Sequence, residues 1–468
     1  MSLFGNLQVA SNALLSHQRG LASVNKNITN VSTKGYKREI PLFQDLPKNG
    51  GIFDEAKRIY NERLQNRYFN TNNANSYNQT LASDLQAIEE SLNDTQGSGF
   101  KGVLDDFFKS MNDIMTAPDN LAAREAFLAD TQSLVGRIRD SYDYLEQLKS
   151  ANHGRIKDLT TKLNDTLTSL AKVNKAILYE SNALDNDKYN TYLNQRDQLL
   201  EKVSSLIDTK IRYNDNGTVD IFSAKGHPLV MGKRAFKVEV QNQPENITIS
   251  DGSNSYDFQT LRTKLLINGV DLTNDFAKGE MGAKLETERT IVDMQTRLNT
   301  FTYTFTNAIN TQHQAGYDLN GDSGGALFGA DNGASHIDAS NIKLAIHDPA
   351  KVAAAADSTT IQADNENIKA LFALKENKYG ALQNQSFQEF YNASLINHIG
   401  SKSAHLQNVA KDSQALFEAI SSKVEELSGV NIDEELMNMQ QLQRGYQASA
   451  RIITVTNTLL DTVMGLVR

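Results

Sequence analysis

The two ends of the chain carry apolar residues at heptad spacing, and these stripes constrain the fold more than any other feature. Near the start, apolar positions recur at alternating steps of four and three from Leu3 to Val31. Near the end, they recur every seven residues from Ile432 to Val467. Such steps place side chains on one helix face, and sustained repetition is typical of a coiled coil. Chain ends usually fray, so this pattern predicts that the terminal helices pair with each other or with copies of the chain.

Between these ends, long helical stretches enclose one β-rich segment. Helical periodicity holds from about residue 61 to 208, whereas residues 209–280 alternate with a period of two and contain the turn signals Asp215-Asn216-Gly217 and Asn268-Gly269. At 468 residues, the chain is too long for one ordinary core. We therefore expect a mainly α, elongated, multi-domain protein with a small inserted β domain, a long helical-bundle body and paired terminal helices. The expected domains are a terminal coiled-coil inner domain (1–40 with 428–468), a helical body (41–208 with 281–427) and the β insertion (209–280).

Two segments beside the stripes carry helix-end signals. The first helix is expected to end near residues 32–35, where Gly35 can adopt the left-handed conformation that closes many helices. At the other end, Asn431 is expected to cap the last helix, with Glu434 reaching back as in a capping box. The pair Ser428-Gly429 then separates the body from the terminal helix and predicts a joint.

Composition excludes several classes of function. The net charge of −9 and the lack of a basic cluster argue against nucleic-acid binding. The chain has no cysteine, which excludes disulfides, a thiol nucleophile and cysteine-ligated zinc. No apolar run approaches 18 residues, so we expect no membrane insertion. The first twenty residues lack the pattern of a cleaved secretory signal, so the protein is expected to stay in the cytosol or to leave by a route without signal cleavage.

Three short patterns resemble chemical motifs, but each fits a structural role better. Residues 97–102 have dinucleotide-binding spacing without the surrounding βαβ unit. Residues 318–322 begin like a calcium loop but lack its bidentate glutamate, which favours an Asx turn. His398 and His405 share a helix face without a nearby carboxylate. The sequence therefore predicts no catalytic, cofactor-binding or metal site, and a protein that is not an enzyme.

Four segments together resemble one family. Residues 27–36 read N-I-T-N-V-S-T-K-G-Y, which resembles the N-I-A-N-x-x-T-x-G-Y motif of flagellar rod, hook and hook-associated proteins, with Thr29 in place of alanine. The segment that opens S-G-V-N-I-D-E-E at Ser428 is similar to the last helix of these axial proteins, and its opening is most similar to that of the members at the hook–filament junction. Residues 194–199 and 310–318 fit the same family. Many relatives insert an outer domain after a segment like 318–322, so this chain resembles a short form.

The resemblance implies a structural subunit of the bacterial flagellum that lies outside the cell, at the junction between hook and filament. It implies export through the flagellar type III channel without a cleaved signal, followed by self-assembly into a ring layer. The implied partners are hook protein below, a second junction protein or the filament above, and an export chaperone on the C-terminal helix. The residues expected at the assembly interface are Leu7, Leu14, Leu21, Asn27, Ile28, Asn30, Gly35, Tyr36, Asn431, Ile432, Met439, Tyr446, Ile453, Leu460 and Val467.

Three alternatives remain at this stage. A hook or distal rod protein shares both terminal motifs, but the long helical stretch over residues 77–207 favours a junction protein. An exported wall-degrading enzyme would need a pair of carboxylates in a cleft, and the sequence offers no candidate pair. A free-standing coiled-coil adhesin would also explain the stripes, but its deletion would leave motility unchanged.

Overall fold

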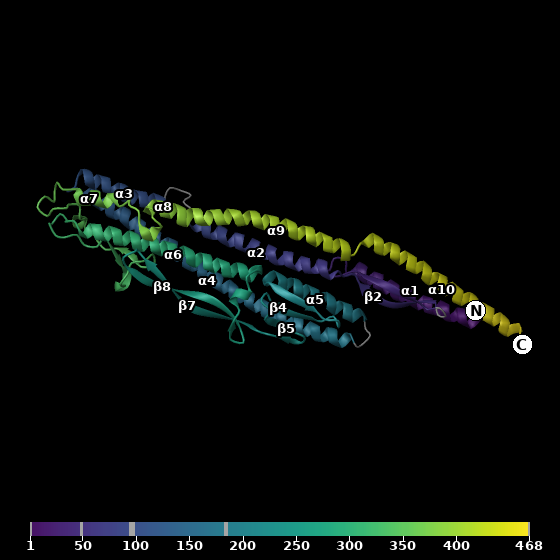
Figure 1. Ribbon diagram of the computed structural model, residues 1–468. Coiled ribbons are helices and arrows are strands. Elements are labelled where there is room, and N and C mark those ends of the chain that lie inside the picture. The colour runs from purple at the N-terminus through teal and green to yellow at the C-terminus, as the bar shows by residue number, and fades with distance from the viewer. Residues whose placement is uncertain (1, 47–49, 93–98, 182–185, 467–468) are drawn as a thin grey trace. The chain divides into compact units, whose positions relative to one another are not determined.

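The computed structural model describes residues 2–46, 50–92, 99–181 and 186–466 (Figure 1). The chain divides into two compact units. The first unit comprises residues 1–76, 161–238 and 412–468, and the second comprises residues 77–160 and 239–411. Three of the four divisions fall inside long helices, α2 (Glu62–Leu92), α4 (Leu121–Glu180) and α9 (His398–Ser428), and the fourth follows Val238, the first residue of a strand.

Helices make up most of the fold, as predicted. They are α1 (Leu3–Thr29), α2 (Glu62–Leu92), α3 (Phe100–Thr116), α4 (Leu121–Glu180), α5 (Asn186–Leu206), α6 (Gly279–Gln314), α7 (Glu366–Ala373), α8 (Phe387–Phe390), α9 (His398–Ser428) and α10 (Ile432–Leu466). A π-helix at Tyr391–Asn397 joins α8 to α9, and short 3₁₀ turns lie at Thr273–Asp275, Asp331–Gly333, Pro349–Lys351 and Gly380–Leu382. The mainly α fold with small sheets that the sequence predicts is confirmed.

The strands form small, separate sheets. They are β1 (Glu39–Leu46), β2 (Gly50–Arg58), β3 (Thr209–Tyr213), β4 (Val219–Ser223), β5 (Pro228–Met231), β6 (Arg234–Ala235), β7 (Val238–Ser250), β8 (Ser255–Ile267), β9 (Val270–Asp271), β10 (Phe328–Ala330) and β11 (Ile342–Leu344). Their orders are β1-β2, β3-β4-β5-β6, β7-β8-β9 and β10-β11. Both predicted turns are present, because Gly217, Asn268 and Gly269 have the positive φ angles that tight hairpins require.

The structure differs from the expected single β domain over residues 209–280. Strands β3–β6 form one sheet and β7–β9 form another, and the compact units divide between Val238 and Glu239. A period of two identifies strands but does not say which strands pair, so two adjacent sheets give the same pattern as one. Strands β1 and β2 form a further hairpin outside residues 209–280, in a segment where Pro41 and the pair Gly50-Gly51 obscure the strand pattern.

The second unit is built around a large aromatic core. Phe305 on α6 is fully buried, and its ring lies between 5.0 and 6.3 Å from five other phenylalanine rings. These rings belong to Phe107, Phe108, Phe301, Phe328 and Phe387. Aromatic side chains remove a large apolar area from water and add favourable ring–ring contacts. This core therefore provides the main stabilisation of the second unit.

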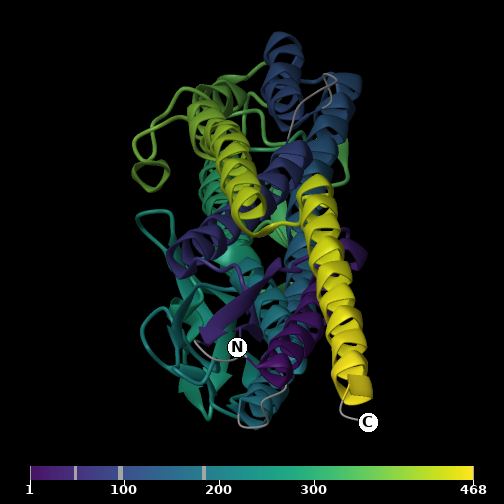
Figure 2. The ribbon, with the colours of Figure 1, turned by 90° about the vertical axis from the view of Figure 1, so that its right-hand side faces the viewer.

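The first unit contains the two terminal helices, which lie side by side (Figures 1 and 2). It also contains the β1–β2 hairpin, which packs against α1, and the sheet β3–β6, whose turn at Gly217 accepts a hydrogen bond from Arg196 of α5. Helix α1 ends at Thr29, earlier than predicted, because Asn30 closes it by donating its side-chain amide to the Lys26 carbonyl at 2.8 Å. Gly35 is still left-handed, with φ of 77°, but it lies in the turn that follows.

Candidate assembly interface

The terminal helices pair in an antiparallel register. Asn27 lies against Glu435, and seven residues back along α1 Gly20 lies against Leu442, seven residues forward along α10. His17 then lies against Gly445, three further residues along each helix. A Cβ atom at Gly445 would be 2.6 Å from the His17 ring, and one at Gly20 would be 3.2 Å from Leu442. Glycines at these crossings therefore let the two backbones approach closely.

Asn27 is the hydrogen-bonding centre of the pair. Its side chain is fully buried, and its amide donates to the Glu39 carbonyl at 2.8 Å and to Glu435 Oε2 at 2.9 Å. Its Oδ1 accepts from the Glu39 backbone N–H at 3.0 Å and from the Tyr36 hydroxyl at 2.9 Å. All four bonding positions of the amide are thus occupied. One residue of the N-terminal motif joins α1, β1 and α10.

Ion pairs surround this centre. Arg38 donates from Nε to Glu435 Oε1 at 2.7 Å and from Nη1 to Glu434 Oε2 at 2.6 Å. Lys26 contacts the buried Glu39 carboxylate at 2.8 Å. Burial raises the pKa of Glu39, although Lys26 acts in the opposite direction. The first turn of α10 is therefore bound to the segment that follows α1 by charges as well as by Asn27.

The expected cap of α10 is present in part. Asn431 Oδ1 accepts from the backbone N–H groups of Asp433 at 3.0 Å and Glu434 at 3.3 Å, as an N-cap residue should. The Glu434 carboxylate, which was expected to reach back toward Asn431, contacts Arg38 instead. An opposite charge within reach offers a stronger partner than a second capping bond.

The joint between α9 and α10 is held by the same short segment. The Arg38 backbone N–H donates to the Ser428 carbonyl at 2.9 Å, and Lys37 Nζ donates to Ser428 Oγ at 3.0 Å. Burial lowers the pKa of Lys37. Upstream, a Cβ atom at Gly35 would lie 2.7 Å from Gln198 Cγ, and the Gln198 amide donates to the Lys34 carbonyl at 2.6 Å. The motif of residues 27–36 therefore continues into a structural connection between both terminal helices and α5.

A buried Arg–Asp–Arg cluster explains the motif at residues 194–199. Asp197 on α5 contacts Arg58 at 2.5 Å and Arg196 at 2.7 Å, and all three side chains are at least nine-tenths buried. Burial works against the Arg196 cation, but Asp197, Tyr60 and Tyr213 together outweigh burial and raise the pKa of Arg196. The Arg58 guanidinium lies over the Tyr60 ring, and that of Arg196 lies over Tyr213. This cluster fixes the end of β2 against α5 within the first unit.

The structure brings most of the expected interface residues onto the terminal pair, but in different environments. Leu7, Leu14, Leu21 and Ile28 are half-buried on α1, as are Met439, Ile453 and Leu460 on α10. Ile432 and Tyr446 are exposed, and Val467 lies outside the described residues. The positions of α10 that are buried in the single chain recur every seven residues, three positions away from this stripe: Glu435, Leu442, Ser449 and Thr456. The heptad period of α10 is present, with a different face turned toward α1.

Much of the apolar surface of α10 is uncovered in the single chain. Ile452 is 50 % exposed and Val455 is 58 % exposed, and Leu459, Val463 and Met464 follow them toward the end of the helix. Continued in register, the last two turns of α10 extend beyond the start of α1 at Leu3, as Figure 1 also shows. Exposed apolar stripes of this kind mark interaction surfaces.

Sequence reasoning missed the acidic and basic residues at the centre of the pair, Arg38, Glu39 and Glu435. A signal for them is present in the charge pattern. Residues 1–38 contain no acidic residue, whereas α10 opens with three acidic residues in its first turn. Segregated charge of opposite sign on two segments that are expected to pair predicts ion pairs between them.

The motif at residues 310–318 has a structural role in the second unit. His313 is fully buried, with Nδ1 2.7 Å from the Gly325 carbonyl and Nε2 accepting from the Ala353 backbone N–H at 2.9 Å. Burial lowers the pKa of His313, so the ring is neutral and ties together two loops. Asp318 Oδ1 accepts from the Asn320 and Asp322 backbone N–H groups, as in the expected Asx turn. Across the part of the chain that the structure describes, no cluster of acidic residues and histidines is arranged to hold a metal ion.

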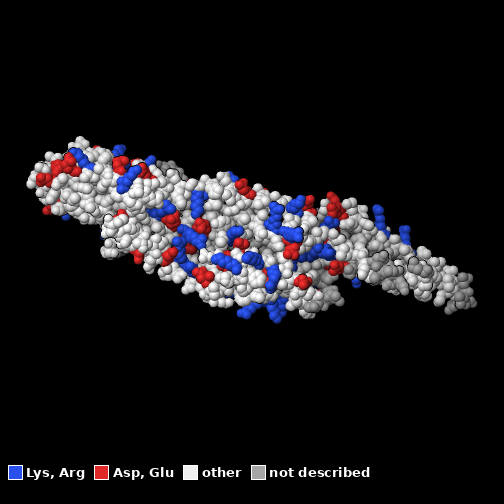
Figure 3. Space-filling view, viewed as in Figure 1, with Lys and Arg blue, Asp and Glu red and all other residues white. Residues whose placement is uncertain are grey.

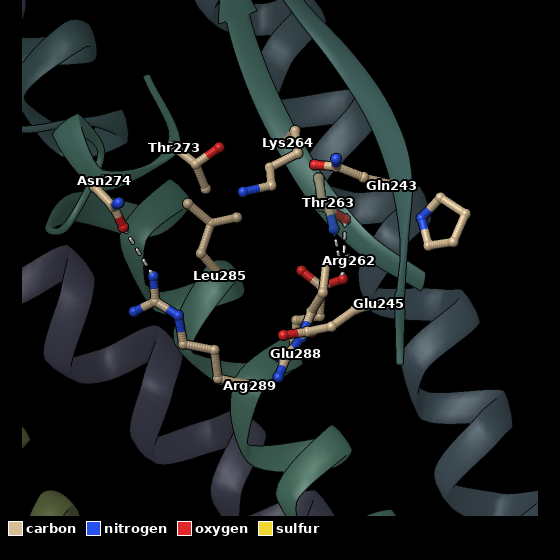
Figure 4. Close-up of a pocket in the computed structure, with 11 residues that line it drawn as sticks. Gln243, Glu245, Arg262, Thr263, Lys264, Thr273, Asn274, Leu285, Glu288 and Arg289 are labelled. Atoms are coloured by element: carbon tan, nitrogen blue, oxygen red, sulfur yellow. Dashed lines mark hydrogen bonds and ion pairs between the residues drawn. The ribbon is translucent and has the colours of Figure 1, made fainter. Parts of the chain in front are cut away.

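A polar cavity of about 440 Å³ lies in the second unit, between the sheet β7–β9 and α6 (Figure 4). Its charged side chains are engaged with protein groups. Arg262 contacts Glu245, Lys264 contacts Asp271, and the Glu288 carboxylate accepts from Thr263 N–H at 2.9 Å. Burial raises the pKa of Glu288. These contacts assign the lining residues to the packing of the sheet on α6.

Two further observations limit the function. On the face shown in Figure 3, basic side chains are interspersed with acidic ones, so that face presents no continuous basic field. Among the residues described, no helix is both long and apolar enough to pass through a bilayer.

Comparison with known proteins agrees with these features. Residues 85–328 match the family described as flagellar hook-associated protein FlgK helical domain, and residues 421–466 match the flagellar basal body rod FlgEFG protein C-terminal family. Flagellar hook-associated protein 1 of Bacillus subtilis is 26 % identical to the chain, over 99 % of this chain and 98 % of that protein. The protein of the same name from Escherichia coli is 24 % identical, over 99 % of this chain and 100 % of that protein.

A solved structure shows the same fold. The flagellar hook junction protein FlgK from Burkholderia pseudomallei aligns with a TM-score of 0.63 at 14 % identity, covering 77 % of this chain and 99 % of that chain. The first of the family matches spans more than half of the chain, and the second coincides with the end of α9 and with α10. The chain therefore belongs to the flagellar hook-associated protein FlgK family, whose members are structural proteins of the bacterial flagellum.

Proposed function

We propose that this chain, a structural subunit of the flagellum at the hook–filament junction, joins the assembly through the terminal helix pair formed by residues 1–40 and 428–468. The observation that carries this proposal is the contrast between the two faces of α10. One face is fixed on α1 by Asn27, Arg38 and close helix contact. The other face exposes a row of large apolar side chains, which a neighbouring subunit would cover.

The geometry also supports a set of partners. A ring layer of copies would cover the exposed stripe of each α10, with hook protein on one side and a second junction protein or the filament on the other. Each large apolar side chain that becomes covered contributes roughly 1.5–3 kcal/mol. Several such residues per copy would stabilise the layer strongly, so the terminal pair gains most of its order on assembly.

The same stripe suits an export chaperone before assembly. An amphipathic helix with one uncovered apolar face is a common ligand for a hydrophobic groove. We expect the chaperone to hold α10 until export, which would proceed through the flagellar type III channel without signal cleavage. Because nothing at the interface resembles a reaction centre, we assign the chain a structural role without catalysis.

The test is to place a charge at a half-buried residue of each terminal helix. Leu14→Glu and Ile453→Glu are expected to give cells with complete hooks, no filaments and flagellin lost to the medium, because a buried charge without a partner opposes association. The matched controls are Asn25→Glu and Gln447→Glu, which place the same charge at exposed polar positions of the same helices.

Electron microscopy of the cells and immunoblots of the medium give the readout. Normal flagella and swimming in both apolar variants would contradict the assembly role of the terminal pair. Loss of the hooks themselves would indicate a rod or hook subunit instead. Limited proteolysis of the dilute monomer adds a second check, since ends that already resist protease would contradict ordering on assembly.

A further inference from the structure

The first unit contains an open surface groove. It has a volume of about 610 Å³ and lies between α1, β1 and α10. Leu442, Pro41 and Phe43 supply apolar wall, and Phe43 is 44 % exposed although its ring lies near His17 and Phe53. Folded proteins usually cover aromatic rings at the bottom of a concave surface. The open groove is therefore suited to receive side chains from outside the chain.

One end of the groove is acidic. Glu39 and Glu435 line it, and Asp433 and Glu434 belong to the same first turn of α10. Among the described residues, Lys26 pairs with Glu39, while Arg38, which also lines the groove, pairs with Glu434 and Glu435. Glu39 is 1 % exposed, and its Oε2 makes no hydrogen bond to any residue that the structure describes. Asn190 lies close enough to favour the charged carboxylate, but its amide donates to the Ala56 carbonyl at 2.7 Å. Because the Glu39 and Glu435 side chains are almost fully buried, an incoming cation would meet Glu434, whose side chain is 50 % exposed, and the exposed Asp433.

The groove also holds an unsatisfied acceptor on its other helix. His17 lines it, and the Nδ1 atom of this ring is buried without a hydrogen-bond partner among the described residues. Burial lowers the pKa of His17, which favours the neutral ring. A neutral imidazole nitrogen without a proton accepts a hydrogen bond. Because this nitrogen is buried, the apolar wall and the exposed carboxylates beside it are the features that match an arginine flanked by aliphatic side chains.

The chain carries such a surface farther along α10. Residues 436–460 contain two arginines and no acidic residue. Both Arg444 and Arg451 are exposed, and Arg451 lies beside Ile452 and one helical turn from Val455, which are themselves at least half exposed. We call Arg444, Arg451, Ile452 and Val455 the basic face of α10.

The groove and the basic face lie on one helix, and this fact identifies the partner. A continuous α-helix cannot fold back on itself, so the first turn of α10 never meets Arg451 of its own chain. Two copies of the chain can meet in this way, each offering its groove to one neighbour and its basic face to the other. Such a head-to-tail contact is heterologous, and it closes into a ring when the rotation between copies allows.

We propose that the groove between α1, β1 and α10 receives the basic face of α10 from a second copy of this chain. The proposal rests on the assembly role stated above and names the surfaces that would carry it. Arg451 occupies the acidic end, while Ile452 and Val455 lie on the wall formed by Phe43 and Leu442. Charge sets the orientation of neighbouring copies, and apolar burial supplies most of the affinity.

Cysteine cross-linking tests the contact directly, because the chain has no cysteine of its own. Asn438→Cys lies in the groove, and Ile452→Cys lies on the basic face. These positions are two heptads apart, or about 21 Å along a helix, and a disulfide needs Cα atoms within about 7 Å. A disulfide in the double variant must therefore join two copies. Mild oxidation of isolated flagella is expected to give a ladder of oligomers, which either single variant alone does not form.

A second pair of cysteine substitutions and a charge-reversal variant keep the contact testable if the first double variant fails to fold or assemble. The second double variant carries Gln441→Cys and Ala448→Cys. These two positions lie about 10 Å apart along the helix, which is again too far for a disulfide within one chain. Arg451→Glu is expected to reduce the number of filaments retained per cell roughly tenfold, which corresponds to about 1.4 kcal/mol. Arg19→Glu is the matched control, since Arg19 is exposed and lies roughly 200° around α1 from His17.

The outcomes separate this contact from the assembly role itself. A ladder in both double variants, together with filament loss in Arg451→Glu alone, supports the contact. Flagella that contain the double variants and hold their filaments, yet give no ladder, would overturn it while leaving the assembly role intact. Cross-linking of the groove cysteine to a different axial protein would overturn it as well. A chain that never enters flagella, even when its sequence is unaltered, would contradict the assembly role and this contact together.

Discussion

The aromatic core of the second unit and the terminal helix pair of the first unit bury different chemistry. Phe305 is surrounded by phenylalanine rings within a large cluster of buried apolar side chains, although α6 also buries polar residues such as Gln295 and Asn299. Apart from Val24, the residues that α1 buries are small or polar, and they include Ser16, Gly20, Ser23 and Asn27. Apolar burial stabilises in proportion to area, so the core is stable by itself. The terminal helix pair buries little apolar area and depends on close helix contact and hydrogen bonds. This suits an element whose remaining apolar surface is covered by neighbouring subunits.

The largest expected effect is in the aromatic core. Phe305→Ala should lower the free energy of unfolding of the second unit by about 3–5 kcal/mol, because it removes a buried ring and leaves a cavity. Urea unfolding followed by circular dichroism measures the change. Phe4→Ala, at a ring that is 71 % exposed on α1, is the matched control and should change little in the monomer. Similar losses in both variants would remove the distinction between the two regions.

An intermediate effect is expected at the centre of the terminal pair. Asn27→Ala removes four hydrogen bonds, so the Glu39 backbone, the Tyr36 hydroxyl and Glu435 Oε2 all lose this partner, which should cost about 2–3 kcal/mol locally. Amide hydrogen exchange should show faster exchange in α1 and α10, while amides around Phe305 keep their protection. Asn25→Ala, at an exposed position of α1, is the control. Equal loss of protection in both units would show that the pair and the core unfold together.

The smallest effect tests close helix contact. Alanine in place of glycine normally stabilises a helix by about 1 kcal/mol, and Gly465→Ala should do so because a Cβ there meets no other atom within 4 Å. Gly445→Ala should instead loosen the pair, since its Cβ would lie 2.6 Å from the His17 ring. Thermal unfolding and exchange rates of α1 measure the difference. Adding His17→Ala should restore the gain, and a stabilised Gly445→Ala single variant would show that the ring yields at no cost.

The sequence predicts the parts of this fold that depend on local signals. The long helices follow from their periodicity, the Asn431 cap from residue type, and the turns at Gly217 and Asn268-Gly269 from their need for positive φ. The pairing of the strands in 209–280 depends on contacts between segments, which local patterns do not encode. The helix face that α10 turns to α1 was also not predictable from large apolar residues. Close approach of two helices favours small residues such as glycine and serine, and a search for hydrophobic stripes does not detect these residues.

Several residues that the sequence motifs single out lie close together in the structure, whereas the ion pairs beside them were not anticipated. Asn27, Gly35, Tyr36 and Asn431 lie at or beside the contact between the terminal segments, where the motifs placed them. The ion pairs of Arg38 with Glu434 and Glu435 were missed, because partners nearly four hundred residues apart give no local pattern. The role of these motif residues and ion pairs in assembly remains a proposal, as does the role of the heptad residues from Leu7 to Leu460.

The four hydrogen bonds of the Asn27 side-chain amide also limit sliding of α10 along α1. If α10 shifted by one heptad along α1, each apolar side chain of its heptad stripe would take the place of another. Hydrophobic contact alone would therefore not prevent the shift. Asn27 would then face Leu442 in place of Glu435, and a buried amide would lose a partner that a leucine cannot replace. Asn27 therefore selects one alignment of the two chain ends whenever the terminal helices pair.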